Sequence, residues 1–167
     1  MTLELRIEGF RVRPLEDKDV TPLQVLFDED PEYFEINGRP IPVEEICNAL
    51  PPGRTRDDKF LYTLIKNDRV AGMIDVVRGY PAPTTWYLGF LFLSKAARGG
   101  GAGRRALHGL YVWSKDQGAM AMRLGVVEGN ARARHLYATE GFVQVAVREP
   151  DPAVNRVRRT LVLARPL

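Results

Sequence analysis

A run of glycines stands between a strongly β-prone segment and a helical pattern, and it constrains the fold more than any other feature of the sequence. Residues 99–103 read Gly-Gly-Gly-Ala-Gly and directly follow Arg98. Glycine lets the backbone approach a ligand closely and adopt turn conformations that other residues avoid. A helix that begins there points unpaired N–H groups and the positive end of its dipole outward. The sequence therefore predicts a strand–loop–helix unit of the kind that cradles phosphates.

Two common phosphate-binding motifs disagree with these residues. A P-loop ends in Gly-Lys-Ser/Thr, whereas Gly103 is followed by Arg104, Arg105 and an alanine. A dinucleotide-binding fingerprint would need a third glycine where these arginines stand, within an early βαβ unit. The segment taken alone leaves open an ordinary glycine-rich turn between a strand and a helix.

Periodicity of the apolar residues predicts the other elements. Strands are expected at 10–13, 59–66, 70–78, 85–93, 120–127, 142–148 and 156–164, and helices at 17–26, 43–50, 103–117 and 130–140. This order predicts one α/β (α+β) domain over residues 1–167, with helices on a mixed, mainly antiparallel sheet. Segment 85–93 is apolar on both faces and is expected to be a central, buried strand.

Composition excludes several classes of protein. The 167 residues are 45% hydrophobic and 27% charged, which is typical of a folded globular chain. No apolar stretch reaches the length of about 18 residues that a membrane span needs, and the N-terminus lacks an apolar signal core. The single Cys47 has no internal partner for a disulfide, so the expected location is the cytoplasm. No Cys/His spacing indicates a metal site.

The positive charge gathers beside the glycine segment. Net charge is only +3, yet six arginines cluster there: Arg98, Arg104, Arg105, Arg123, Arg132 and Arg134. A local concentration of this kind favours a phosphorylated ligand over a merely solvated surface. Nucleic acid is not expected as a partner, because the cluster lacks the interleaved aromatic residues of a single-strand platform.

Two motifs, taken together, resemble the GNAT superfamily of N-acetyltransferases. Arg98, Gly101 and Gly103 match its acetyl-CoA-binding pattern Arg/Gln-x-x-Gly-x-Gly/Ala. Downstream, segment 126–137, with Asn130 and Tyr137, is followed by Gly-Phe at 141–142 and is similar to the second cofactor motif of that family. The resemblance is sharp over residues 86–142 and general elsewhere.

The resemblance implies an acetyl-CoA-dependent enzyme that acetylates a primary amine of a small molecule or peptide, by direct transfer in a ternary complex. It assigns the Leu93 backbone N–H to the oxyanion, Asn130 to the pantetheine arm and Tyr137 to general acid catalysis. The expected contacts to acetyl-CoA, a cosubstrate, are Leu91, Phe92, Leu93, Arg98, Gly99, Gly100, Gly101, Ala102, Gly103, Arg104, Asn130, Ala133 and Tyr137.

The general base is less clearly indicated. Many relatives place a carboxylate on the strand before the glycine loop, but segment 85–93 contains none. Asp75 stands in an apolar run, where burial costs energy unless the carboxylate has a partner or a purpose. A structural, hydrogen-bonded Asp75 and a water relay to solvent are the alternatives.

The acceptor is the feature that the sequence describes least. Segment 28–53 is acidic and weakly favours a cationic amine, although a solvated acidic face explains it equally well. A non-catalytic acyl-CoA-binding module on the same fold is the alternative function, and a homodimer is a further hypothesis.

Overall fold

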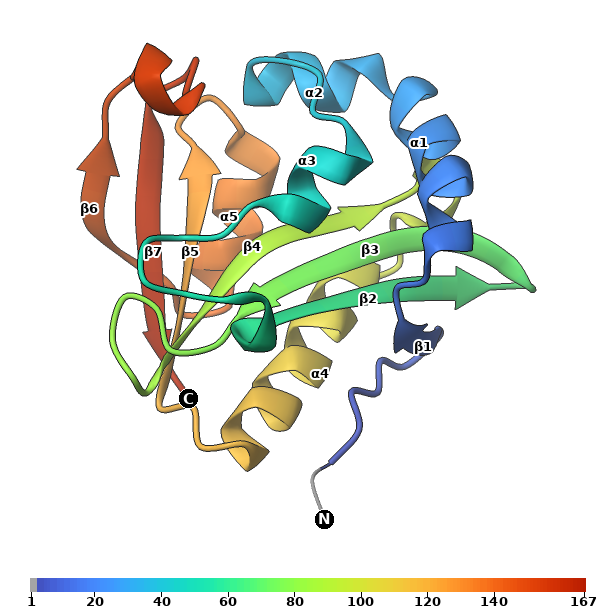
Figure 1. Cartoon of the computed structure of the whole chain (residues 1–167), viewed down its shortest axis with the longest axis horizontal. Helices are drawn as coiled ribbons and strands as arrows, with labels where there is room; N and C mark the ends of the chain where they lie inside the picture. The colour runs from blue at the N-terminus through green and yellow to red at the C-terminus, as the bar shows by residue number, and fades with distance from the viewer. Residues whose placement is uncertain (1–2) are drawn as a thin grey trace.

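One seven-stranded sheet organises the computed structural model, which describes residues 3–167 (Figure 1). The strands follow the spatial order β1-β2-β3-β4-β5-β7-β6. Their bounds are β1 (Arg11–Pro14), β2 (Lys59–Lys66), β3 (Arg69–Val77), β4 (Thr85–Leu93), β5 (Ala121–Val127), β6 (Val143–Arg148) and β7 (Thr160–Pro166). Neighbouring strands are antiparallel except for β4 and β5, which are parallel.

Helices cover both faces of this sheet (Figure 1). The front face carries α1 (Val20–Asp28), α2 (Pro31–Asn37) and α3 (Val43–Asn48), and the back face carries α4 (Ala102–Asp116) and α5 (Ala131–Thr139). Short 3₁₀ turns occur at Asp17–Asp19, Arg56–Asp58, Lys95–Ala97 and Pro152–Val154. The predicted fold class, a mainly antiparallel mixed sheet flanked by helices, is confirmed. No helix within residues 3–167 combines the length and the apolar character that crossing a bilayer requires.

The predicted strands and helices are present with ends shifted by up to four residues, and one further helix was not predicted. Strands 59–66 and 85–93 have the predicted bounds, and 85–93 is central. Helix α2 was missed. The first helix begins at Val20 rather than at residue 17, because residues 17–19 form a 3₁₀ turn. The last strand begins at Thr160 rather than at residue 156, because Arg156 N turns back to donate to Asp151 O at 3.0 Å.

Each face of the sheet has its own apolar core. On the back face, Trp86 packs edge-on against Trp113 of α4, with ring centroids 5.2 Å apart. On the front face, Phe27 of α1 contacts Phe34 of α2 and Phe92 of β4, at 5.0 and 4.8 Å between ring centroids. The front core is the smaller of the two. Its helices therefore depend more on polar anchors to stay on the sheet.

The parallel pair β4–β5 separates along its length. Residues Thr85–Leu88 of β4 pair with Ala121–Leu124 of β5, and the pairing stops there. Beyond this point β4 stays bonded to β3 as far as Leu93, while β5 stays bonded to β7 as far as Val127. The sheet is consequently split between its two central strands, and we call this opening the fork.

A buried carboxylate fastens the start of α1 to the sheet. Asp19 accepts hydrogen bonds from Arg13 at 2.6 and 2.7 Å, from Glu16 N at 2.8 Å and from the Thr63 hydroxyl at 2.9 Å. Burial alone would raise the pKa of Asp19, but these hydrogen bonds outweigh it and hold the pKa at about 2. One side chain thus ties β1, the 3₁₀ turn and β2 together.

We expect Asp19→Asn to lower the free energy of unfolding by about 2 kcal/mol at pH 7. Because the pKa of Asp19 is depressed, its contribution is complete above about pH 4 and is lost as the pH falls toward 2. Urea unfolding should therefore show the wild type and the variant converging in stability at low pH. The exposed Asp17→Asn serves as control and should change stability by less than about 0.5 kcal/mol. A constant gap between wild type and Asp19→Asn from pH 7 to pH 2 would contradict this role.

Candidate active site

The fork exposes backbone groups of β4 in the middle of the sheet. Ser94 N donates to Ala71 O of the neighbouring strand at 2.8 Å. Successive backbone groups of a strand point to opposite edges, so the N–H groups of Leu91 and Leu93 point toward β5, from which β4 has separated. The Phe92 side chain instead packs in the front core. Leu91 and Leu93 can therefore offer backbone hydrogen bonds to a ligand in the fork.

The glycine loop turns the chain from β4 into α4. Gly99, Gly100 and Gly101 have φ values of 88°, 59° and 80°, a left-handed conformation that side chains disfavour. Within the loop, Ala102 N donates to Gly99 O at 3.2 Å. In the part of the chain that the structure describes, Gly101 N and Gly103 N have no acceptor. These amides lie at the N-terminus of a 15-residue helix, where an anion is favoured.

Gly103 has a different reason to be glycine. A Cβ added to it would lie 3.3 Å from Leu136 Cδ2 of α5. Its lack of a side chain therefore lets the first turn of α4 pack closely against α5, so the loop and the second motif lie next to each other.

The three arginines in and directly after the loop, Arg98, Arg104 and Arg105, have partners within the protein. Arg98 forms an ion pair with Asp30, whose side chain is only 4% exposed. Arg104 pairs with Glu140 after the end of α5, at 3.1 Å. Arg105 donates to the carbonyls of Gly100 and Glu8, at 2.5 and 3.2 Å. Of the predicted contacts, Arg104 is thus directed toward α5, whereas Arg98 joins the loop to α2.

Helix α2 brings three residues to the site that sequence reasoning missed: Asp30, Tyr33 and Asn37. The centroids of the Tyr33 and Phe92 rings lie 5.3 Å apart, and the Arg98 guanidinium lies 5.5 Å from the centroid of the Tyr33 ring. Burial raises the pKa of Tyr33, and the nearby Tyr137 hydroxyl adds to the effect. Asp30 followed by a proline is a usable signal for such a helix, because aspartate favours the N-cap and proline the first turn. The structure confirms this cap, in which Asp30 accepts from Tyr33 N at 3.4 Å.

Helix α5 begins at Asn130, the predicted N-cap. Its side chain accepts from Ala133 N at 3.1 Å and contacts Asn37 of α2 across a separation of 3.5 Å. The Ala133 side chain packs against the back core. Asn130 therefore stands where α2 and α5 meet.

Tyr137 packs its ring against Phe142, with centroids 5.5 Å apart. Burial raises the pKa of Tyr137 to about 12, so the hydroxyl keeps its proton at neutral pH. Among residues 3–167 no group forms a hydrogen bond with this hydroxyl, which leaves it able to donate to a ligand. Its proximity to Tyr33 places it near the part of β4 that lies beyond the fork.

Asp75 lies on the front face at the base of the fork. A Cβ added to Gly89, the first residue of β4 beyond its pairing with β5, would lie 2.7 Å from Asp75 Oδ2. Lys59 donates to Asp75 Oδ1 at 2.8 Å, and both side chains are buried. Burial raises the pKa of Asp75, although Lys59 opposes this. Asp75 therefore has a structural partner, Lys59, which was one of the alternatives that the sequence left open. The Asp75 carboxylate also borders the fork.

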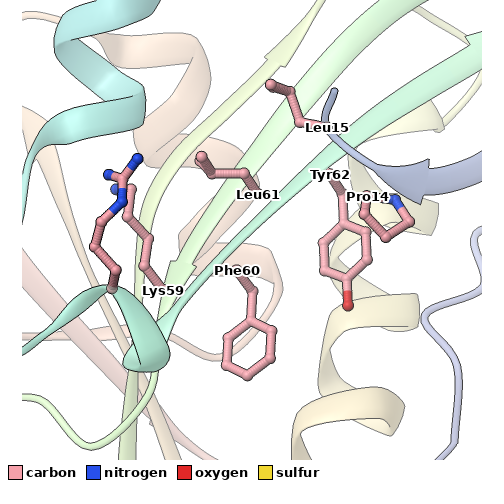
Figure 2. Close-up of a pocket in the computed structure, with 7 residues that line it drawn as sticks. Pro14, Leu15, Lys59, Phe60, Leu61 and Tyr62 are labelled. Atoms are coloured by element: carbon pink, nitrogen blue, oxygen red, sulfur yellow. The ribbon is translucent and has the colours of Figure 1, made fainter. Parts of the chain in front are cut away.

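Two hollows accompany the site. The first, of about 290 Å³, lies along the exposed edge of β2 where β1 stops (Figure 2), and its lining includes none of the predicted site residues. In Figure 2, Phe60 and Tyr62 point to one side of the strand and Leu61 to the other. The second hollow, of about 240 Å³, lies between the end of α2, the end of β5 and the β6–β7 loop. It is the one next to Asn130.

Comparison with known proteins gives a family match over residues 23–142, to the acetyltransferase (GNAT) family model. No curated protein matches the chain in sequence. Solved structures share its fold: an acetyltransferase from Thermus thermophilus superposes with a TM-score of 0.75 at 22% identity, covering 96% of this chain and 99% of that one.

Two further solved structures are ribosomal-protein alanine N-acetyltransferases. The one from Brucella melitensis has a TM-score of 0.70 at 20% identity and covers 94% of this chain and 99% of its own. The one from Escherichia coli has a TM-score of 0.66 at 19% identity and covers 94% and 93%. At these identities the similarity concerns the fold.

We expect Asp75→Asn to destabilise the protein by about 3 kcal/mol, because it leaves the buried Lys59 ammonium without its counter-charge. The double variant Asp75→Leu/Lys59→Met should recover most of this loss, since an apolar pair can replace a buried ion pair. Asp57→Asn, in an exposed position nearby, is the control. The measurement is chemical denaturation at pH 7, and a fully stable single variant would show that Lys59 and Asp75 do not depend on each other.

Proposed function

Because the chain belongs to the GNAT acetyltransferase family, we propose that it is an acetyl-CoA-dependent N-acetyltransferase. It transfers the acetyl group to a primary amine of a small molecule or peptide, directly and within a ternary complex. The observation that carries the proposal is the fork between β4 and β5, with the glycine loop beside it. A cytoplasmic location is part of the same proposal.

The donor, acetyl-CoA, is bound mainly by backbone groups. The N–H groups of Leu91 and Leu93 face the fork and can bond the pantetheine arm and the thioester oxygen. The amides of Gly101 and Gly103 can bond the pyrophosphate at the N-terminus of α4. Asn130 borders the same opening from α5. Backbone donors held in a sheet and a helix are fixed before the ligand arrives, so they stabilise an oxyanion with little reorganisation.

The acceptor amine must lose a proton before it attacks, because an alkylammonium has a pKa near 10.4. We propose that the Asp75 carboxylate accepts this proton, directly or through a water molecule. Burial raises the pKa of the carboxylate, which makes it a stronger base than an exposed aspartate. Its pairing with Lys59 fixes its position at the base of the fork.

The neutral amine nitrogen then attacks the thioester carbon, and the C–S bond breaks as the tetrahedral intermediate collapses. The nitrogen releases its extra proton to solvent as the amide forms. The Tyr137 hydroxyl donates to the departing sulfur. With a pKa of about 12 it is a weaker acid than a thiol, whose pKa is near 8.5. Its contribution is therefore a hydrogen bond that strengthens as negative charge develops on sulfur and stabilises the departing thiolate. The thiolate takes up, through solvent, the proton that the nitrogen releases.

Transfer of labelled acetyl groups from acetyl-CoA to a panel of amines, together with release of free thiol, tests the proposal. We expect Gly101→Glu to abolish acetyl-CoA binding, since its side chain would bring negative charge to the pyrophosphate site. Gly118→Glu is the matched control, because Gly118 also has a positive φ (97°) but caps the far end of α4 in open space. Both variants carry similar backbone strain, of about 1 kcal/mol.

Calorimetry and thermal shift with acetyl-CoA distinguish the outcomes. Binding that Gly101→Glu removes, together with transfer to an amine, supports the enzyme. Binding without transfer to any amine would instead indicate the acyl-CoA-binding module. No binding at millimolar ligand, or equal binding by both glycine variants, would contradict the donor site.

Tyr137→Phe should reduce turnover by about 100- to 10,000-fold while acetyl-CoA affinity and stability change little. The ring that packs on Phe142 is retained, so the loss isolates the hydroxyl. Because the pKa of Tyr137 is about 12, the ratio of wild-type to variant rates should stay constant from pH 7 to about pH 10. Steady-state rates across this range are the measurement. A variant that keeps more than about a third of its turnover would remove Tyr137 from catalysis.

A further inference from the structure

The second hollow has the place that an acceptor site requires. Its lining comes from the end of α2 and the chain after it (Asn37, Arg39, Ile41), from Val127 and Thr160 where β5 and β7 pair, and from residues 154–158 of the β6–β7 loop. Val127 is the last residue of the strand that forms one side of the fork. Asn37 also contacts Asn130 at 3.5 Å. The hollow therefore adjoins the opening where the acetyl group would be presented.

The two loops that wall the hollow contact each other. Arg39 Nε donates to Asn155 O at 3.3 Å. The Arg158 side chain lies over Gly38, where an added Cβ would come within 2.9 Å of Arg158 Cγ. Gly38 has a φ of 113°, so glycine is needed here for both conformation and space. Contacts between the chain after α2 and the β6–β7 loop therefore hold the two walls of the hollow together.

Its charge is positive and only partly compensated. Arg39 is paired with the Glu45 carboxylate through two hydrogen bonds of 3.2 and 2.5 Å. Arg156 donates to the neutral backbone carbonyl of Glu149 at 2.9 Å, and Arg158 has no ion-pair partner among residues 3–167. Three guanidinium groups therefore line the hollow with one carboxylate to balance them.

Neighbouring charges do not cancel this excess. Arg159 is held outside the hollow by Glu128 and Glu149, at 2.9 and 3.0 Å, so those two carboxylates are already occupied. Asp151, whose backbone pairs with that of Arg156, accepts from Ala153 N within its own turn and forms no ion pair with Arg156 or Arg158 among residues 3–167, although its charge reduces the excess. Arg123 of β5, Arg148 of β6 and Arg156 of the β6–β7 loop are close enough to Tyr87 to oppose the effect of burial, which raises the pKa of Tyr87. The front surface of β5, β6 and β7 is accordingly basic.

We propose that this hollow binds the acceptor and selects amines that carry a carboxylate, with Arg158 and Arg156 as its recognition residues. The proposal rests on the proposed acetyltransferase function and names the substrate class of that site. Guanidinium groups bind carboxylates through paired, charge-assisted hydrogen bonds, which makes them specific for this group. An acceptor with a carboxylate differs from the cationic acceptor that the acidic segment 28–53 weakly favoured. Two of those acidic residues, Asp30 and Glu45, are bound to arginines.

Matched acceptors that differ only in the carboxylate test this proposal. An ω-amino acid is compared with its primary amide, and a peptide with acidic residues after its N-terminal alanine is compared with the same peptide carrying Asn and Gln. The first pair represents a free small molecule and the second a protein terminus. We expect kcat/KM to be at least about tenfold higher for the carboxylate member of one pair, since charge-assisted hydrogen bonds are among the stronger ones in proteins.

Arg158→Gln and Arg156→Gln should each lower kcat/KM for the carboxylate acceptor by about 10- to 100-fold and change that for the amide by less than about twofold. Arg158→Glu should favour the amide over the acid. Arg69→Gln, at the β2–β3 hairpin, removes the same charge far from the hollow and should have no effect. Equal rates for acid and amide, or no loss in Arg158→Gln, would overturn the proposal.

Calorimetric binding of the same acceptors in the presence of CoA gives a readout that needs no turnover. Tighter binding of the carboxylate member, lost in Arg158→Gln, supports the carboxylate site. If such binding occurs without any acetyl transfer, only the proposed enzymatic function is contradicted. Equal binding of acid and amide by the wild type contradicts the carboxylate site while leaving the transferase proposal intact.

Discussion

The separation of β4 from β5 is the constraint on which the rest of the site depends. The backbone N–H and C=O groups of a central strand normally form hydrogen bonds with both neighbouring strands, because a buried polar group without a partner destabilises the fold. Here β4 has one neighbour beyond Leu88, because β5 diverges with β7. The residues around the opening follow from this: Gly89 makes room for Asp75 at its base, and α4 begins at the loop after β4. The opening can exist only because both separated strands keep an antiparallel partner on their other side.

Ionic anchors hold the front helices over this opening. Asp19 is fastened to Arg13, Asp75 to Lys59 and Asp30 to Arg98, and all three carboxylates are buried. Each pair joins segments that are distinct elements of the fold. The front core is small, so the pairs of Asp19 and Asp30 help to fix the starts of α1 and α2. The pair of Asp75 instead joins β2 to β3, and its Lys59 also donates to Ala49 O after α3, at 2.8 Å. For Asp19 and Asp75, burial of the carboxylate and its cationic neighbour act on the pKa in opposite directions.

Local patterns in the sequence predicted the fold and the elements on which the proposed donor residues stand. Segment 85–93 was recognisable because β-prone residues run up to a glycine loop, and Asn130 because a cap precedes a helical pattern. Helix α2 was missed because prolines and acids in segment 28–53 resemble a loop, and it carries Tyr33 and Asn37. The partners of Arg98 and Asp75 lie 68 and 16 positions away, so only the folded chain reveals them. The basic hollow was hidden for the same reason, since its arginines come from two distant loops.

The ion pair between Arg98 and Asp30 joins the loop that would hold the donor to the helix that borders the acceptor hollow. A phosphate that drew Arg98 away would remove a partner from the residue that caps α2, and the wall containing Asn37 would then move more freely. The two ligands would be energetically linked, and linkage is reciprocal: whatever the donor does to acceptor affinity, the acceptor does equally to donor affinity. A single side chain between two sites can in this way couple the two affinities, with no separate regulatory domain.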